Sequence, residues 1–370
     1  MNSRKLFSMV VATALLALGV AACGSDDSTG SDSTGAASDS SLSGEIAGAG
    51  SSAQEAAQEA WIAGIQDASP DVSIAYDPVG SGGGREQFIA GGVDYAGTDS
   101  AFEDQELTDA QKRCTDQSGE MIQIPVYISA IAVVYNLPEV ENLQLSPETL
   151  AGIFDQKITN WNDPAIAKDN PDAKLPDQRI TVVNRSDESG TTENFQQYLA
   201  AVAPSVWDFE VDGNWPVKGG EAAEGTSGVV AAVKAGKGAI GYADASQAGE
   251  LGVAKIKVGS QWAEPTPEAA AKILEESPAD KALAKGPYMF PFELDRKTAS
   301  RGTYPIVLVS YLIACTKYDS ASEAEIVKGY LRYAISAEGQ EVAAENAGSA
   351  PLSAALTEKV EPAVEAIEAG

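Results

Sequence analysis

Four short segments of this sequence are rich in hydroxyl and charged residues or glycine, and three of them combine glycine with serine or threonine. Three of them precede an expected helix, whose first turn has unsatisfied N–H groups and a partial positive charge. Glycine lets a ligand approach the backbone closely, and serine or threonine adds a hydroxyl donor. Three such helix ends converging on one point would form a cage for a small tetrahedral oxyanion. The segments are Gly48-Ala49-Gly50-Ser51-Ser52-Ala53, Gly80-Ser81-Gly82-Gly83-Gly84, Thr98-Asp99-Ser100 and Arg185-Ser186-Asp187-Glu188-Ser189-Gly190-Thr191-Thr192.

Each segment also has a simpler interpretation. A glycine and hydroxyl pair before a helix is often only a cap, and Ser52 with Glu55 matches the capping-box spacing. The first segment fits the G-x-G-x-x-A pattern of dinucleotide sites, but the strand before it is very short, and no segment has the Gly-Lys-Ser/Thr of a P-loop. Asp99 could cap a turn, and Arg185 with Asp187 could be a surface ion pair. The joint occurrence of the four segments is what favours an anion site.

The composition excludes several functions. The 370 residues include 54 acidic and 25 basic ones, for a formal net charge of −29, whereas a nucleic-acid partner requires a basic surface. The sequence has no histidine, which removes the usual general base and the commonest zinc ligand. We therefore expect no catalytic residue, no metal and no cofactor. A secreted phosphatase with Ser52 or Ser189 as nucleophile is the least favoured alternative.

The N-terminus has the features of an export signal. Arg4 and Lys5 precede an apolar run that ends in small residues just before Cys23, a pattern typical of a signal peptide over residues 1–22. The run Val20-Ala21-Ala22-Cys23 resembles a bacterial lipobox, which implies a lipid on Cys23 and attachment to the outer face of the cytoplasmic membrane. An ordinary cleaved signal and an uncleaved anchor are the alternatives. Residues 23–43 are rich in Ser, Asp, Gly and Thr and are predicted to be a flexible tether.

Lipidation of Cys23 would leave two cysteines in the folded part, Cys114 and Cys315. None of the three cysteines forms a C-x-x-C motif, so a thiolate metal site is not expected. Outside the cytoplasm the two remaining cysteines could form one disulfide. Two buried free thiols are the alternative.

Short apolar strands alternate with amphipathic helices from Gly44 onward, which predicts an α/β fold with mainly parallel strands. Two apolar stretches are expected to cross between two lobes, so that the first lobe comprises residues 44–132 plus 307–370 and the second comprises 133–306. Two lobes joined by two strands form a hinge around a cleft. Strands are expected at 72–76, 121–126, 131–135, 179–183 and 304–313, and helices at 53–66, 87–91, 147–153, 193–202, 227–235, 267–276 and 323–334.

Taken together, these motifs resemble the PstS-type phosphate-binding protein of the bacterial phosphate ABC importer. The likeness runs from about Gly44 to about Ala355. It implies a type II periplasmic-binding-protein-like fold, with two α/β lobes joined by a two-strand hinge and the ligand in the cleft. Besides the four segments, the matching motifs are Asp94-Tyr95-Ala96-Gly97, Lys157-Ile158-Thr159-Asn160-Trp161-Asn162-Asp163-Pro164-Ala165-Ile166 and Gly238-Ala239-Ile240-Gly241-Tyr242.

The resemblance implies a phosphate site built from both lobes. Asp99 would accept a hydrogen bond, Arg185 would be the one cationic donor, and Asp187 would hold Arg185. The sequence departs from the family pattern at Ala53, where an aromatic residue is frequent, and at Glu188, where a glycine is frequent. Glu188 adds a negative charge beside the expected site. The remaining residues implied to contact phosphate are Ser51, Ser52, Ala53, Ser81, Ser189, Gly190 and Thr191.

Asp99 bears on which anion is bound. Phosphate carries a proton at neutral pH and sulfate carries none, so the Asp99 carboxylate could accept from phosphate but would face sulfate with an unpaired like charge. The resemblance implies high-affinity binding of inorganic phosphate outside the cytoplasmic membrane and its delivery to an ABC permease and its ATPase subunits. The binder is expected to be a monomer. A binder of another tetrahedral oxyanion is the alternative.

Overall fold

The computed structural model describes residues 42–370. The predictions for the signal peptide, for Cys23 and for nearly all of the tether lie outside this range and stay predictions. Among the described residues, no helix combines the length and the apolar character that crossing a membrane requires.

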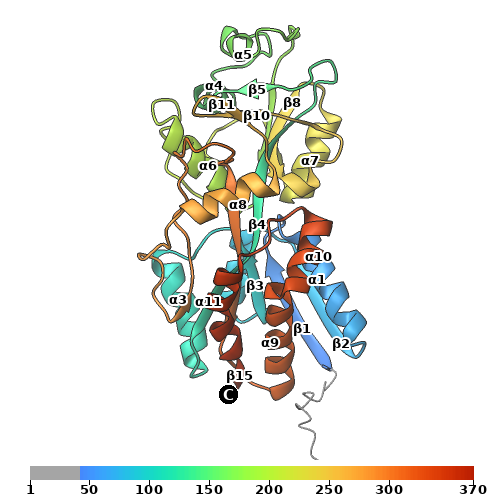
Figure 1. The fold of residues 1–370 in the computed structure, drawn as a ribbon, viewed down its shortest axis with the longest axis vertical. Helices are drawn as coiled ribbons and strands as arrows, with labels where there is room; N and C mark the ends of the chain where they lie inside the picture. The colour runs from blue at the N-terminus through green and yellow to red at the C-terminus, as the bar shows by residue number, and fades with distance from the viewer. Residues whose placement is uncertain (1–41) are drawn as a thin grey trace, which may run out of the picture. The chain divides into compact units, whose positions relative to one another are not determined.

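Strands and helices alternate along most of the chain (Figure 1). The strands are β1 (Gly44–Gly50), β2 (Val72–Asp77), β3 (Tyr95–Thr98), β4 (Met121–Tyr135), β5 (Gln144–Leu145), β6 (Thr181–Arg185), β7 (Glu221–Ala223), β8 (Ala239–Asp244), β9 (Gly252–Val253), β10 (Lys255–Val258), β11 (Gln261–Ala263), β12 (Tyr288–Met289), β13 (Val307–Cys315), β14 (Lys317–Tyr318) and β15 (Glu368–Ala369). The helices are α1 (Glu55–Ala68), α2 (Ser81–Ile89), α3 (Asp104–Asp116), α4 (Pro147–Phe154), α5 (Pro164–Asp169), α6 (Gly190–Val202), α7 (Gly225–Ala235), α8 (Pro267–Glu276), α9 (Ala321–Ile335), α10 (Ala337–Ala347) and α11 (Ala354–Glu365), with a short 3₁₀ helix, η1 (Ala245–Gln247).

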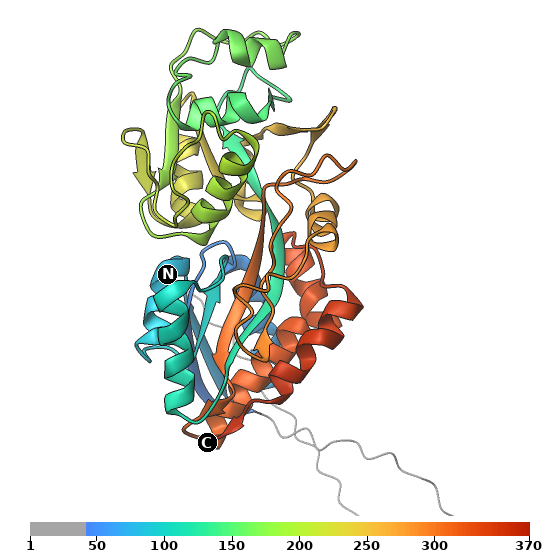
Figure 2. The same ribbon diagram turned by 90° about the vertical axis from the view of Figure 1, so that its left-hand side faces the viewer.

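One long sheet organises the described residues, with the strand order β2-β1-β3-β13-β4-β8-β6-β7. Strand β4 pairs with β13 over its first part, Met121–Ala130, and with β8 over its last part, Ile131–Tyr135. We call the half around β1, β2, β3 and β13 the first lobe and the half around β6, β7 and β8 the second lobe. Both lobes carry helices on their sheets, and β4 runs from one to the other (Figures 1 and 2). The predicted two-lobed α/β fold is confirmed.

The centre of the sheet differs from the sequence-based expectation. Strands β1, β2 and β3 are parallel, as are β6, β7 and β8, but β13 runs antiparallel to β3 and β4, and β4 runs antiparallel to β8. The two strands expected at 121–126 and 131–135 are one continuous strand, β4. Pro125 lies inside β4 because the register shifts beside it, between Ser310 and Tyr311 of β13, and such irregularities accommodate the missing N–H of proline. Strand β13 begins at Val307 rather than 304, although Ile306 still accepts a hydrogen bond from the Ile131 N–H at 2.7 Å.

The glycine run after β2 belongs to a helix rather than to a loop. Helix α2 begins at Ser81 instead of near residue 87. Glycine is costly inside a helix, but here it allows α2 to lie directly against β1. A Cβ on Gly84 would come within 2.7 Å of the Ala49 carbonyl oxygen and 2.9 Å of the Gly50 nitrogen. The run therefore brings the start of α2, and with it Ser81, close to the end of β1.

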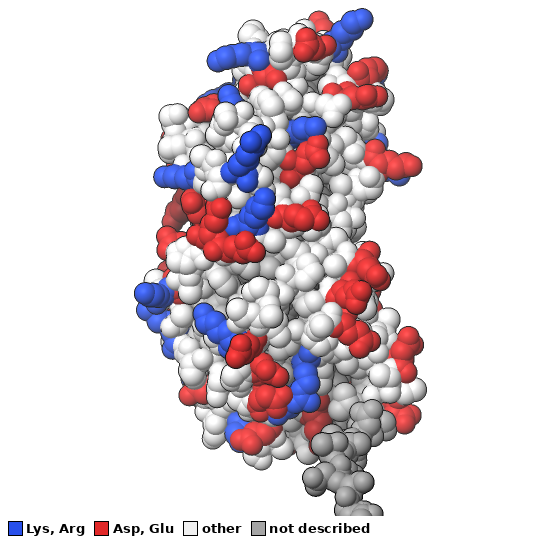
Figure 3. Space-filling model, in the orientation of Figure 1, with Lys and Arg blue, Asp and Glu red and all other residues white. Residues whose placement is uncertain are grey.

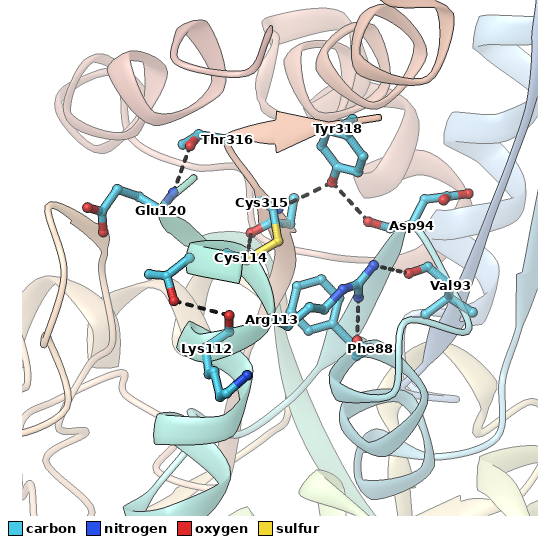
Figure 4. Close-up of a disulfide and its surroundings, with 12 residues drawn as sticks. Phe88, Val93, Asp94, Lys112, Arg113, Cys114, Glu120, Cys315, Thr316 and Tyr318 are labelled. Atoms are coloured by element: carbon cyan, nitrogen blue, oxygen red, sulfur yellow. Dashed lines mark hydrogen bonds between the residues drawn. A yellow bond between two sulfur atoms is a disulfide. The ribbon is translucent and has the colours of Figure 1, made fainter. Parts of the chain in front are cut away.

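Cys114 and Cys315 form a disulfide within the first lobe (Figure 4). Cys114 lies near the end of α3 and Cys315 ends β13, and their Cα atoms are 5.3 Å apart. Both cysteines are buried. Beside them, the Arg113 guanidinium donates to the Phe88 carbonyl and, at 2.7 Å, to the Val93 carbonyl. The disulfide therefore joins α3 to the sheet at the end of β13.

Candidate anion-binding site

The first lobe brings its predicted site residues together at one sheet edge. Strands β1, β2 and β3 are parallel, so their carboxyl ends lie side by side. Ser51 follows β1, Ser81 opens the helix after β2, and Asp99 follows β3. The Gly80 N–H ties two of these ends together by donating to the Gly50 carbonyl at 2.9 Å. All five predicted residues of this lobe are at most 3% exposed: Ser51, Ser52, Ala53, Ser81 and Asp99.

Asp99 is held by its own lobe through the backbone and the side chain. Its N–H donates to the Ser81 hydroxyl at 3.1 Å. One carboxylate oxygen, Oδ1, accepts from the hydroxyl of Ser310, a fully buried residue in the middle of β13. These contacts leave Oδ2 facing the second lobe.

The second lobe supplies its part of the site from one loop. Strand β6 ends at Arg185 and helix α6 begins at Gly190, with Ser189 as the N-cap whose hydroxyl accepts from the Thr192 N–H at 3.2 Å. As first-turn residues, Gly190 and Thr191 have N–H groups with no acceptor inside the helix. Together with the helix dipole, these groups favour an anion at this end of α6.

Arg185 is buried beside an acidic partner. Its Nε donates to Asp187 Oδ1 at 2.8 Å, and its Nη2 donates to Asp187 Oδ2. Burial alone would raise the pKa of Asp187, but hydrogen bonds and the charge of Arg185 outweigh burial and hold that pKa below its usual value. The Gly225 N–H, at the start of α7, also donates to Asp187 at 3.0 Å. The guanidinium is thereby held in one orientation, with Nη1 outside the ion pair.

Aromatic packing beneath the loop supports this geometry. The rings of Phe195 and Tyr242 stack with centroids 4.6 Å apart, and Phe154 and Trp215 complete the cluster. The Tyr242 hydroxyl accepts from the Arg185 N–H at 3.3 Å and lies 2.7 Å from the Thr192 hydroxyl. The loop therefore rests on a rigid base in the second lobe.

The two lobes meet at the predicted residues. The Thr191 hydroxyl donates to Asp99 Oδ2 at 3.0 Å. A Cβ on Gly190 would lie 2.7 Å from the Ser81 hydroxyl oxygen and 2.8 Å from the Asp99 Cβ, so glycine permits this approach. The Asn194 side chain donates to the carbonyl of Asp99 at 2.7 Å and to that of Gly190 at 2.9 Å. Residues far apart in sequence thus share one buried centre.

Ser52 also contacts the second lobe, but at Thr226 and Gln247 and not at the loop from Arg185 to Thr191. Its hydroxyl accepts from the Thr226 N–H at 3.0 Å and lies 3.0 Å from the Thr226 hydroxyl. The Gln247 side chain donates to the Ser52 carbonyl at 2.9 Å. The capping-box interpretation is wrong, because α1 is preceded by Gln54 without a side-chain cap.

Three of the expected contact residues use their backbone N–H groups within their own lobe. The Ser51 N–H donates to the Gly97 carbonyl at 2.9 Å, and the Ala53 N–H donates to the Ser51 hydroxyl at 3.1 Å. In the other lobe, the Ser189 N–H donates to the Gly213 carbonyl at 2.9 Å. These groups shape the loops, while the Ser189 hydroxyl proton and the first-turn N–H groups of α6 remain for a ligand.

Several residues around the centre were not predicted from the sequence. The sequence could have indicated Ser310, because it is a hydroxyl residue inside an otherwise apolar strand, Val307-Leu308-Val309-Ser310-Tyr311-Leu312. Asn194 follows Gly190 by one helical turn and so lies on the same face. Thr226 and Gln247 have no signal of that kind, because tertiary packing alone brings them to Ser52.

A cavity of about 260 Å³ lies on another side of Asp99 and is lined by Glu103, Glu193, Asp280 and Arg296 among others. Burial raises the pKa of Glu193 to about 7. Carboxyl groups outnumber the single guanidinium in this lining, so the cavity does not suit an anion. In residues 42–370, no group of three or more Cys, Asp or Glu side chains could hold a metal ion.

The buried centre differs in character from the outer surface. Acidic side chains spread over both lobes on the face shown in Figure 3, and basic ones are fewer. The centre instead offers hydroxyl and N–H donors, one guanidinium and one carboxylate. Dipoles and charges at contact distance act strongly in a dehydrated site, whereas surface charges are screened beyond roughly 8–10 Å. The arrangement suits a small oxyanion that has at least one proton to donate.

Comparison with known proteins gives the family of the chain. Residues 35–338 match the family model of the PBP superfamily domain. Phosphate-binding protein PstS3 of Mycobacterium bovis is 36% identical over 362 residues, covering 95% of both chains. Phosphate-binding protein PstS of Methanocaldococcus jannaschii is 33% identical, covering 76% of this chain and 75% of that one.

Solved structures give the same fold. A high-affinity periplasmic phosphate-binding protein, PfluDING, bound with phosphate has a TM-score of 0.72 at 23% identity, covering 86% of this chain and 93% of that one. A phosphate-binding protein from Stenotrophomonas maltophilia has a TM-score of 0.66 at 20% identity, covering 86% and 94%. These structures show the fold, whereas the family model and the sequence relatives establish that the chain belongs to the PstS-type phosphate-binding proteins of the PBP superfamily.

Proposed function

We propose that this protein binds inorganic phosphate between its two lobes, outside the cytoplasmic membrane, and delivers it to an ABC permease for uptake. The observation that carries the proposal is the contact of Thr191 with Asp99 at 3.0 Å, at the point where two buried donor loops meet. The similarity to proteins named for phosphate binding supports the same ligand.

The proposed ligand contacts come from both lobes. Ser52 and Ser81 donate from the first lobe, and the Ala53 N–H would exchange its contact with the Ser51 hydroxyl for the ligand. Ser189, Gly190 and Thr191 donate from the second lobe. Arg185 provides the one positive charge, and Asp187 orients it. Micromolar binding requires about −8 kcal/mol, which several charge-assisted hydrogen bonds can supply.

Asp99 provides the proposed selectivity. Both of its carboxylate oxygens accept hydroxyl hydrogen bonds, from Ser310 and from Thr191. The Thr191 hydroxyl can rotate toward a ligand, which leaves Oδ2 to accept a proton from phosphate. Sulfate has no proton to offer, and its charge would face a buried carboxylate. Asp99 thus disfavours sulfate while it binds protonated phosphate.

Binding to a site this buried requires the lobes to separate. The proposed boundaries are residues 44–132 plus 307–370 for the first lobe and 133–306 for the second. Strand β4 and the extended segment before β13 connect the lobes, and both can act as hinges.

Isothermal titration of the purified chain, freed of bound phosphate, tests this function. We expect one phosphate per chain with micromolar or tighter affinity, and no heat with sulfate at similar concentrations. Equal binding of sulfate would contradict the role of Asp99, and the absence of phosphate binding would contradict the function itself. Incubation with a generic phosphomonoester belongs in the same experiment, because release of phosphate would favour the phosphatase alternative.

The location and partners are further parts of the proposal. A fatty acid on Cys23 would anchor the chain to the outer face of the membrane, with residues 23–43 as tether. A monomer would then dock on the permease, whose ATPase subunits drive transport. Metabolic labelling with a fatty acid tests the anchor, and label retained by a Cys23→Ala variant would contradict it.

A further inference from the structure

Arg85 braces the segment that carries Asp99. It lies in the second turn of α2, follows the glycine run directly, and is 5% exposed. Its Nη1 donates to the hydroxyls of Thr98 at 3.2 Å and Ser100 at 3.0 Å, the two neighbours of Asp99. Its Nε donates to both carboxylate oxygens of Glu106 in α3, at 2.8 and 2.9 Å. The Arg85 guanidinium therefore positions Asp99 by holding the residues on either side of it.

The remaining nitrogen of Arg85 reaches the other lobe. Its Nη2 donates to Glu188 Oε1 at 2.8 Å. Glu188 lies between Asp187 and Ser189, inside the loop that presents the second lobe's anion donors. The Gly82 N–H donates to the Glu188 carbonyl at 3.2 Å, and a Cβ on Gly82 would lie 2.7 Å from the Glu188 Cβ and Cγ. Glu188 is thus in direct contact with α2 and forms an ion pair with Arg85.

We propose that Arg85 and Glu188 form an ionic clasp that links the two anion-binding loops and sets the rate at which the ligand leaves. The proposed contact residues of both lobes are buried, so a bound ion cannot leave until the lobes part, and parting breaks the Arg85–Glu188 pair. Arg85 and Glu188 act through other residues and are positioning residues. The inference rests on the proposed phosphate-binding function.

The charge of Glu188 has a second effect, which must be separated from the first. A carboxylate near the site repels an incoming anion, and its removal by itself would speed association. A clasp acts on the closed form, and its removal speeds dissociation. Arg85 is almost fully buried, while the Glu188 side chain is 46% exposed. The ion pair is therefore partly desolvated, and we expect its strength to lie between that of weak surface pairs and that of strong buried pairs.

Kinetics of phosphate release by wild type and Glu188→Gln test the clasp. Labelled phosphate is bound, excess unlabelled phosphate is added, and release is followed; association is measured separately. We expect the dissociation rate of Glu188→Gln to rise by about 3–10-fold and the association rate to change by less than about 2-fold. Raising the salt concentration from about 0.05 to about 0.5 M should speed wild-type release and bring the two dissociation rates closer, because salt screens the half-exposed pair.

Glu139→Gln is the matched control, because it removes the same charge from an exposed ion pair, with Lys237, inside the second lobe. Its phosphate release should match that of wild type. Ligand-free Glu188→Gln should melt within about 2 °C of wild type, which separates loss of the clasp from loss of folding.

An unchanged dissociation rate in Glu188→Gln, with wild type binding phosphate normally, would overturn the clasp alone. Faster association with unchanged release would replace the clasp by simple repulsion. A wild-type chain that binds no phosphate would overturn the proposed function, and with it the role of the clasp in release.

Discussion

The two lobes build their halves of the site in different ways. The second lobe uses one continuous loop, from Arg185 to Thr191, in which the ion pair, the helix cap and the first-turn N–H groups are all local in sequence. The first lobe uses three strand ends that are far apart in sequence and are placed by the register of β1, β2 and β3. The second lobe therefore concentrates binding in a few residues, while the first distributes it over the sheet.

Replacing Arg185 is the most direct test of whether binding by the second lobe depends on a few residues. Arg185→Gln removes the only guanidinium assigned to the ligand and leaves Asp187 buried without its partner. Loss of a buried, hydrogen-bonded charge costs about 2–5 kcal/mol, so phosphate affinity should fall by between about 30-fold and about 4,000-fold. Isothermal titration measures the change.

Asp187→Asn is the companion variant. It keeps the charge of Arg185 but weakens its fixed orientation, so we expect a loss of only about tenfold in affinity. If the two variants lost the same affinity, orientation rather than charge would be the main contribution of this loop.

In the first lobe, Asp99→Asn should change selectivity more than affinity. The amide no longer repels an unprotonated anion and can donate to it, while phosphate loses one acceptor. We expect phosphate affinity to fall by about tenfold and sulfate binding to become measurable, so that the preference for phosphate drops by about 100-fold. Titrations with both anions measure this, and an unchanged preference would show that selectivity arises elsewhere.

The same contrast explains how much could be predicted from the sequence. The loop from Arg185 to Thr191 is readable because its donors, its partner Asp187 and its helix cap are neighbours in the chain. The segments that contain Ser52, Ser81 and Asp99 were readable only as separate motifs, since their convergence depends on parallel pairing. The two-lobed fold followed from alternating strands and helices, but the antiparallel centre did not, because hydrophobic patterns carry no strand direction.

Contacts between the lobes were the least predictable part. Glu188 was recognised as a departure from the family pattern, yet nothing in the sequence indicated that it turns to Arg85. Thr226 likewise reaches Ser52 only because α7 packs on β6, β7 and β8 and begins beside the site. Such pairings depend on how the two lobes are joined by β4, and no local pattern encodes them.

Ser310 tests whether the first lobe depends on residues outside its three strand ends. Ser310→Ala removes the hydroxyl that holds Asp99 Oδ1 but leaves every ligand donor in place. We expect phosphate affinity to fall by about threefold to tenfold. This is less than the roughly 1.5–3 kcal/mol of a full hydrogen bond to a charged group, because Ser310 acts on the ligand only through Asp99. Ser129→Ala, in the neighbouring strand β4, is the control, because its buried hydroxyl donates to the Ala130 carbonyl at 3.4 Å and not to Asp99. Equal losses in the two variants would indicate a packing effect rather than an effect on Asp99.

The disulfide should affect the stability of the first lobe and leave binding unchanged. Cys114 and Cys315 are 201 residues apart in sequence, and a cross-link over such a long loop strongly restricts the unfolded chain. Replacing both by serine should lower the free energy of unfolding by about 2–5 kcal/mol, measured by denaturant titration. Phosphate affinity should stay within about twofold of wild type, because the bond joins α3 to the end of β13 and touches none of the three strand ends that carry the site. A large loss of affinity in this folded variant would mean that the first lobe needs the disulfide, as well as the strand register, to place Asp99.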